Sequence, residues 1–217
     1  MNSPTYRFIP AMFHAVMQRR KTQTRRVMTP VPAEGFEPEP GPCELYEPAM
    51  EDRHGMLYPG PEVYGIYTED AGWVAPFGKP GTVKPVVTTW AVRQTLDHVK
   101  PMKLQPDECN LLWFDDGVTP KPDWAGKSRP SMFFPSHLYH LAPQARCVAV
   151  KVERVQDISE EDAIAEGATP SIVGSPDLEA MRYRLGFRTL WDSINERRGY
   201  GWQVNPLVFA TTFELVQ

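Results

Sequence analysis

Proline limits where this chain can keep regular structure. The 217 residues include 23 prolines. Proline lacks a backbone N–H and fixes φ, so helices and inner strands tend to stop where one occurs. Pro30 and Pro32 end the first regular stretch, and Pro76 and Pro80 force a turn further along the chain. Long regular elements are therefore confined to the intervals between prolines.

Those intervals predict short strands and a few helices. Strands are predicted over residues 5–8, 62–67, 82–91, 146–155 and 207–216, and helices over 10–17, 159–167 and 175–198. Pro85 requires an edge or a bulge in its strand. Val148, Val150 and Val152 are expected on one face of theirs. Because no βαβ order is present, the sequence predicts an α+β fold around a small barrel.

The helix ends carry capping residues. Ser159 offers an N-cap ahead of three acidic residues, and Gly167 supplies a left-handed end to that helix. The next helix is expected to open at Ser175-Pro176-Asp177 and to stop at Gly199, with an interruption at Gly186.

The segment 30–62 is too acidic and too poor in aliphatic residues to form a core by itself. It contains one basic residue, Arg53, against eight acidic ones. We expect an extended insertion or a partly mobile loop within a single domain of residues 1–217. A solvated loop is the simpler interpretation, and a partner-binding segment is the alternative.

Composition narrows the function classes. No apolar run is long enough for a membrane span and no secretion signal is recognisable, so a cytoplasmic protein is expected. Three cysteines without a C-x-x-C pair, and histidines without a further ligand at metal spacing, predict no disulfide framework, no metal and no cofactor. A net charge of −4 argues against indiscriminate adhesion to nucleic acid.

A basic run at residues 19–26 carries the chemistry. It reads Arg19-Arg20-Lys21-Thr22-Gln23-Thr24-Arg25-Arg26, and no acidic residue lies between Arg7 and Glu34. Cations at the end of a helix are favoured by its dipole without any function. The functional interpretation is that a Lys with a depressed pKa activates a Thr hydroxyl while an Arg holds a phosphate or carbonyl oxygen.

Several segments resemble the ASCH family of small PUA-like β-barrels, in its phage and prophage form. Lys21, Thr24 and Arg26 stand at the spacing of the family's G-x-K-x-x-T-x-R signature. Further resemblance lies in residues 8–28, in residues 76–81, in Arg129-Pro130-Ser131, and in residues 152–163, 190–195, 199–202 and 205–206. The resemblance covers roughly 100 residues in family order, a span that fits one small domain. It implies a PUA-like barrel and a phage or prophage protein in a bacterial host.

The resemblance also implies an activity. Characterised ASCH amidohydrolases remove the acyl group from N4-acetylcytidine with the signature Lys and Thr and a Glu on a later strand. Lys21 and Thr24 match those two residues, but Thr88 occupies the position of the Glu. Losing a general acid or base removes about 10²–10⁴ in rate. Arg19 also departs from the family, because the signature has Gly there. Val87, Pro85 and Phe134-Pro135-Ser136 depart from it as well.

Other carboxylates are candidates to replace the missing Glu. Glu69, Asp70, Asp97 and Glu153 lie on flanking or later segments, but spacing singles out none of them. Most carboxylates are simply solvated.

The remaining candidate residues are predicted to bind a ligand. Aromatic side chains can stack a nucleobase, an amide can contact a base edge, and Arg or Ser can hold phosphate. The predicted binding residues are Arg25, Arg26, Thr88, Trp90, Arg129, Ser131, Tyr200, Trp202 and Asn205. Core packing is the alternative for Trp90 and Trp202, and an exposed loop position is the alternative for Arg129.

Three functions remain open. The first is a divergent ASCH protein that binds a nucleobase, a nucleotide or RNA in a basic pocket. The second is an amidohydrolase acting on N4-acylcytidine-like amides through Lys21 and Thr24, with RNA cleavage as a related variant. The third is a phage factor that binds a host protein through the acidic segment 30–62.

Overall fold

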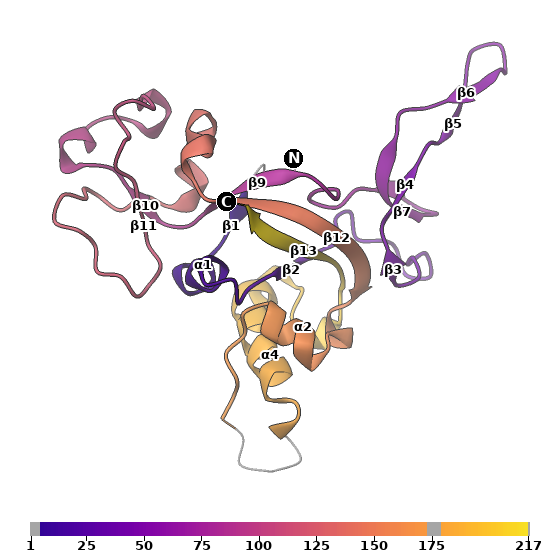
Figure 1. The fold of residues 1–217 in the computed structure, drawn as a ribbon. Helices are drawn as coiled ribbons and strands as arrows, with labels where there is room; N and C mark the ends of the chain where they lie inside the picture. The colour runs from indigo at the N-terminus through magenta and orange to yellow at the C-terminus, as the bar shows by residue number, and fades with distance from the viewer. Residues whose placement is uncertain (1–4, 173–178, 217) are drawn as a thin grey trace. The chain divides into compact units, whose positions relative to one another are not determined.

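The protein has a mixed α+β fold, as the sequence predicts (Figure 1). The structure is a computed structural model and describes residues 5–172 and 179–216. The chain divides into two compact units. The first comprises Met1–Thr22, Val83–Arg146 and Glu214–Gln217, and the second Gln23–Thr82 and Cys147–Phe213. The expected single domain stays a prediction.

The expected closed barrel is not formed by the described strands. Strands β12 (Gln144–Arg154) and β13 (Leu207–Val216) each pass from one unit into the other. The six-stranded sheet has the order β1-β9-β12-β13-β2, and β3 also pairs with β12. This path is open, with β1 and β2 at its ends. A strand of two residues, as β1 is, offers too little backbone to close a barrel.

In its described residues, the first unit combines short strands with an α-helix. Strand β1 (Tyr6–Arg7) runs parallel to β9 (Val83–Val87), and β9 pairs antiparallel with the first residues of β12. Strand β10 (Trp90–Ala91) pairs with β11 (Trp113–Phe114). The remaining elements are helix α1 (Pro10–Met17) and four 3₁₀ helices: η1 (Gln94–Leu96), η2 (Pro101–Lys103), η3 (Ser131–Phe133) and η4 (Ser136–Leu141).

Apolar side chains fix these elements to one another. Trp90 is the largest fully buried side chain of the unit, and the ring of Phe134 meets it edge-on at 5.0 Å. Helix α1 reaches the same region, because Phe13 lies 5.7 Å from Phe114 between ring centroids. His14 of α1 also contacts Asp116 at 3.4 Å.

The second unit is richer in strands. It contains β2 (Gln23–Val27), β3 (Gly41–Pro42), β4 (Glu44–Tyr46), β5 (Ala49–Glu51), β6 (Leu57–Pro59), β7 (Val63–Thr68) and β8 (Gly72–Val74). Its helices are α2 (Glu160–Ala165) and α4 (Arg182–Asn195), with the 3₁₀ helices η5 (Val155–Asp157), η6 (Glu196–Arg198) and η7 (Trp202–Val204). Strands β4, β7 and β8 form one small sheet, and β5 and β6 form a hairpin.

The paired strands β2 and β13 have two different faces. Side chains alternate across a strand, so Val208 packs with the apolar residues of α2 and α4, including Phe187 and Trp191. Leu207 and Phe209 point the other way, into a cluster that includes β8 and β12. Helices α2 and α4 therefore cover one face of this strand pair (Figure 1).

Several predicted elements are confirmed. Helix α1 and strand β13 have the predicted bounds. The Ser159 hydroxyl accepts a hydrogen bond from the backbone N–H of Asp162, and Gly167 and Gly199 have positive φ. Pro85 pairs with Gln144 of β12, while β1 pairs only with the next two residues of β9, so a proline is tolerated there.

Other predictions were wrong. Val148 is 48% exposed whereas Val150 and Val152 are buried, because two consecutive residues of β12, Val148 and Ala149, face outward. Such a shift in alternation is typical of a bulge. Helix α4 continues through Gly186, whose missing Cβ lets the Thr169 carbonyl approach. The predicted helix opening at 175–177 lies outside the described residues.

The acidic segment 30–62 is more regular than its composition predicts. Strands β3, β4, β5 and β6 lie within it, and β4 pairs with β7. In the described residues no helix has the length and apolar character that crossing a bilayer requires.

Candidate functional site

The basic run begins at the end of α1 with a Schellman motif. The N–H of Arg19 donates to Val16, and the N–H of Arg20 donates to Ala15, at 2.8 and 2.9 Å. This pattern requires a left-handed residue after the helix, and Arg19 has φ +58°. Arg19 tolerates this conformation less well than glycine, the residue that the ASCH signature has at the equivalent position.

Lys21 follows the motif and belongs to the first unit. It is 3% exposed, its N–H donates to the Ala15 carbonyl at 3.0 Å, and its ammonium nitrogen lies 5.3 Å from the ring centroid of Phe8. The end of α1 therefore fixes the backbone of Lys21, and an aromatic face lies against its charge.

The side chains of the rest of the basic run belong to strand β2 and lie on its two opposite faces. Thr24 and Arg26 share one face, and Arg25 lies on the other, because side chains alternate along a strand. Neighbouring β13 presents Phe209 beside Arg26 and Thr211 beside Thr24.

Arg25 is held by carboxylates. Its side chain is fully buried and contacts Glu153 at 2.7 Å, Asp162 at 2.8 Å and Glu166 at 3.2 Å. Lys151 adds a second cation, 2.8 Å from Glu153 and 3.1 Å from Asp162. We call these five side chains the carboxylate cage. Because its guanidinium is occupied, the geometry favours a structural role for Arg25, which fastens α2 to β2 and β12.

The cage also shifts the pKa of one of its carboxyl groups, that of Asp162. Burial alone would raise the pKa of Asp162. Hydrogen bonds from Gln23 and Lys151, together with the charges of Arg25 and Lys151, instead hold that pKa below its ordinary value.

The opposite face of β2 carries Thr24 and Arg26, and Arg26 lies beside Phe209, which packs in a buried apolar cluster. Thr24 and Thr211 lie opposite each other, 8% and 3% exposed, and neither hydroxyl makes a hydrogen bond within the described part of the chain. Arg26 is partly exposed, and its guanidinium carbon lies 3.9 Å from the ring centroid of the buried Phe77. We call Thr24, Arg26, Phe77 and Thr211 the threonine–arginine face.

Thr88 and Trp90 are both fully buried in the first unit. The Thr88 hydroxyl has no hydrogen-bond partner among the described residues. The indole N–H of Trp90 donates to the Pro130 carbonyl at 3.2 Å. Trp90 is therefore a core residue, which was the alternative interpretation of this position.

Arg129 lies against Trp90. Their backbones exchange hydrogen bonds of 2.7 and 3.0 Å, and the guanidinium carbon lies 5.3 Å from the ring centroid of Trp90. One Arg129 nitrogen donates to Leu96, and the other terminal nitrogen has no hydrogen-bond partner in the described chain. Ser131, the first residue of η3, is partly exposed. Arg129 is thus not the exposed loop residue that the alternative interpretation requires.

Hydrogen bonds hold the connection into β13, and they involve Tyr200, Trp202 and Asn205. The Tyr200 carbonyl accepts from the indole of Trp191, and the backbone N–H of Trp202 donates to Asp192. The Asn205 side-chain oxygen accepts from the N–H of Gln156 at 3.0 Å. The Asn205 amide oxygen therefore has a structural partner already.

Carboxylates proposed as replacements for the Glu are engaged elsewhere. Glu153 belongs to the carboxylate cage. Asp70 accepts from the backbone of Ala33, and Asp97 accepts from the backbone of Lys127, both at 2.7 Å. Glu69 is exposed. These contacts do not identify a general base.

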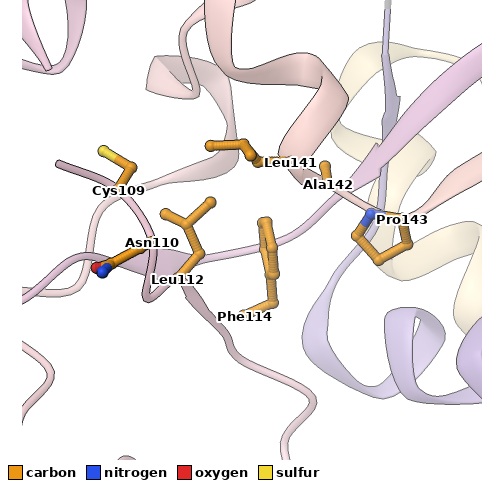
Figure 2. Close-up of a pocket in the computed structure, with 7 residues that line it drawn as sticks. All are labelled: Cys109, Asn110, Leu112, Phe114, Leu141, Ala142 and Pro143. Atoms are coloured by element: carbon orange, nitrogen blue, oxygen red, sulfur yellow. The ribbon is translucent and has the colours of Figure 1, made fainter. Parts of the chain in front are cut away.

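An apolar depression of about 440 Å³ lies in the first unit, between the segments 109–114 and 141–143 (Figure 2). Leu112, Phe114 and Leu141 converge on it, whereas the amide of Asn110 points away from them. Because Asn110 is the one amide among its lining side chains, the depression has little means of orienting a polar substrate through side chains.

Cys43 is a free, buried cysteine. Burial, with a smaller effect of the Cys147 thiol, raises the pKa of Cys43 to about 12, so a reactive thiolate is disfavoured. Within residues 5–172 and 179–216, no three His, Cys, Asp or Glu side chains are placed to hold a metal ion.

Sequence reasoning missed three residues of interest. Phe8 lies against Lys21, Phe77 lies under Arg26, and Thr211 lies opposite Thr24. Phe77 stands in the segment 76–81 that resembles the family, which was a usable signal. No sequence signal pointed to Thr211, because its place opposite Thr24 depends on the strand register, which was not known from the sequence.

Comparison with known proteins adds no relative, since no family model, no curated protein and no solved structure matches this chain.

Proposed function

We propose that this protein is a divergent member of the ASCH family that binds a cytidine-type nucleobase, free as a nucleotide or within RNA. The binding surface is the threonine–arginine face, with Arg26 as its central residue. This face lies within the second unit, and the predicted roles of Lys21, Thr88, Arg129 and Ser131, which belong to the first unit, stay separate predictions.

One observation supports the proposal above others, namely the way strand β2 separates its two arginines. Arg25 is neutralised inside the carboxylate cage, while Arg26 stays partly exposed beside Phe77. A guanidinium plane supported by an aromatic ring is a surface on which a base can stack or to which a phosphate can bind.

The two hydroxyls suit the same ligand. The hydroxyls of Thr24 and Thr211 make no hydrogen bond in the described chain, so each hydroxyl retains one donor and its acceptor capacity. A cytosine edge presents a donor amine beside acceptors and can pair with such groups. Because the chain is acidic overall, a local site fits better than a wide nucleic-acid footprint.

Binding is favoured over hydrolysis by the engaged carboxylates. The amidohydrolase alternative assigns Thr24 as nucleophile and Lys21 as base, and it requires a carboxylate in place of Thr88. Glu153, Asp70 and Asp97 are each held by other partners.

Calorimetric titration of the full chain with cytidine, cytidine monophosphate and N4-acetylcytidine tests the proposal. We expect binding of at least one ligand, weakened about tenfold by Arg26→Gln, which corresponds to about 1.4 kcal/mol. Arg188→Gln is the matched control, because Arg188 is an exposed arginine on α4. Equal affinities for Arg26→Gln and the wild type would reject the site.

Mass spectrometry of the same mixtures separates the two functions. We expect N4-acetylcytidine to stay intact. Acetate release that Lys21→Ala and Thr24→Ala both abolish would establish the hydrolase instead.

A further inference from the structure

The acidic segment carries a hairpin that projects beyond strands β4 and β7 (Figure 1). We call residues 44–62 the arm. Its hairpin pairs Met50 of β5 with Tyr58 of β6. Asp52 orders the turn, since its carboxylate accepts from the backbone N–H groups of His54 and Met56 at 2.8 and 2.9 Å. The tip is therefore a defined turn.

Large apolar side chains of the arm face solvent. Met56 and Leu57 at the tip are 70% and 71% exposed, and Met50 and Tyr58 are 42% and 45% exposed. Met50 and Tyr58 share one face of the hairpin, and Leu57 lies on the other. A two-stranded hairpin without a core is marginal in water, and clustered exposed apolar groups are typical of binding surfaces.

Acidic residues outnumber basic ones in the arm. The arm contains one basic residue, Arg53, and five acidic ones: Glu44, Glu47, Glu51, Asp52 and Glu62. This charge repels the phosphates of nucleic acid and of anionic lipid, and it attracts lysine and arginine. Charge complementarity therefore favours a basic protein surface.

Strand addition is a poor mode of binding for this arm. Strands β5 and β6 have three residues each, and prolines lie at Pro48 and Pro59. Short edges with prolines resist pairing with another strand. Recognition must rely on side chains, with the tip residues as anchors.

We propose that the arm is a docking element for a partner protein that presents an apolar stripe edged by lysine or arginine, as a basic amphipathic helix does. Met56 and Leu57 fill the apolar stripe, and Glu47 and Glu51 face its basic edge. This inference is independent of nucleotide binding.

A dye-labelled amphipathic peptide of leucine and lysine, about 18 residues or five turns long, is a suitable probe. Fluorescence anisotropy with the full chain should show saturable binding that weakens as salt rises. We expect Met56→Ser/Leu57→Ser to weaken binding about tenfold or more. Glu47→Gln/Glu51→Gln should weaken it and flatten its salt dependence.

Matched controls make the test decisive. Met102→Ser removes an equally exposed methionine, 68% exposed, from the first unit and should leave binding unchanged. A scrambled peptide of the same composition should bind far more weakly. Absence of peptide binding, equal binding of the scrambled peptide, or a tip variant that binds like the wild type would overturn the proposal. So would tip-dependent binding to poly(U) RNA or phosphatidylglycerol vesicles.

Discussion

Two buried threonine hydroxyls differ in their partners. Thr68 is 2% exposed, and its hydroxyl donates to Gly72 and accepts from Ala71. Thr88 is fully buried, and its hydroxyl has no partner among the described residues. An unsatisfied buried polar group costs about 1–3 kcal/mol.

Thr88→Val should therefore raise the free energy of unfolding by about 1 kcal/mol, because it removes the unpartnered hydroxyl at little change in volume. Thr68→Val, the matched control, should lower it by a similar amount. Urea denaturation followed by fluorescence measures both. Destabilisation by Thr88→Val would show that its hydroxyl has a partner in solution.

Arg19 is strained by its position. Its φ of +58° is favourable for glycine but costs other residues roughly 1 kcal/mol. Arg19→Gly should stabilise the chain by about 0.5–1 kcal/mol, whereas Arg19→Val should destabilise it. Thermal melts at equal protein concentration compare the variants, and a lower melting temperature for Arg19→Gly would contradict the Schellman assignment.

At the scale of elements, the carboxylate cage makes the stability of the contacts between α2 and strands β2 and β12 depend on pH. The pKa of Asp162 is lowered from its ordinary 3.8. Its stabilising effect is therefore present above that value and is lost as pH falls through the lower folded pKa. The pKa of Asp116 in the first unit is lowered too, by backbone hydrogen bonds from Val118 and Thr119.

The free energy of unfolding should accordingly stay level from neutral pH to about pH 5 and fall below about pH 4. Asp162→Asn should cost about 1 kcal/mol at pH 7, and this difference should shrink in acid. Chemical denaturation across pH 3–7 tests the sign. A difference that grows as pH falls would contradict it.

Local chemistry accounts for the elements that the sequence predicted well. Proline at a helix start, serine as N-cap and glycine after a helix act within a few residues, so α1, α2 and the end of α4 were predictable. The shift in β12 at Val148 depends on its neighbours across the sheet, as does the regular structure of segment 30–62. Both required tertiary information.

The candidate site, like the fold, was predictable from local sequence only in part. The residue types of the basic run pointed to anion or base binding, but all its cations looked alike in sequence. Only the faces of β2, with the carboxylates of α2 and β12 on one side, distinguish Arg25 from Arg26. The open strand path likewise depends on pairing that local patterns do not encode.

At the scale of the whole molecule, the two proposed binding surfaces lie on different segments of the chain. We propose that the threonine–arginine face binds a small planar ligand and that the acidic arm binds a basic protein partner. The sequence agrees with this separation, because segment 30–62 has eight acidic residues against Arg53 alone, whereas no acidic residue lies between Arg7 and Glu34.

The measurement that tests the central claim most directly is a two-dimensional NMR titration of the full chain with cytidine monophosphate, which locates the ligand as well as detecting it. We predict that the largest amide shifts belong to Thr24, Arg26, Phe77 and Thr211, and that they disappear in Arg26→Gln. Shifts confined to the depression of Figure 2 or to the arm, or no shifts at millimolar ligand, would contradict the account.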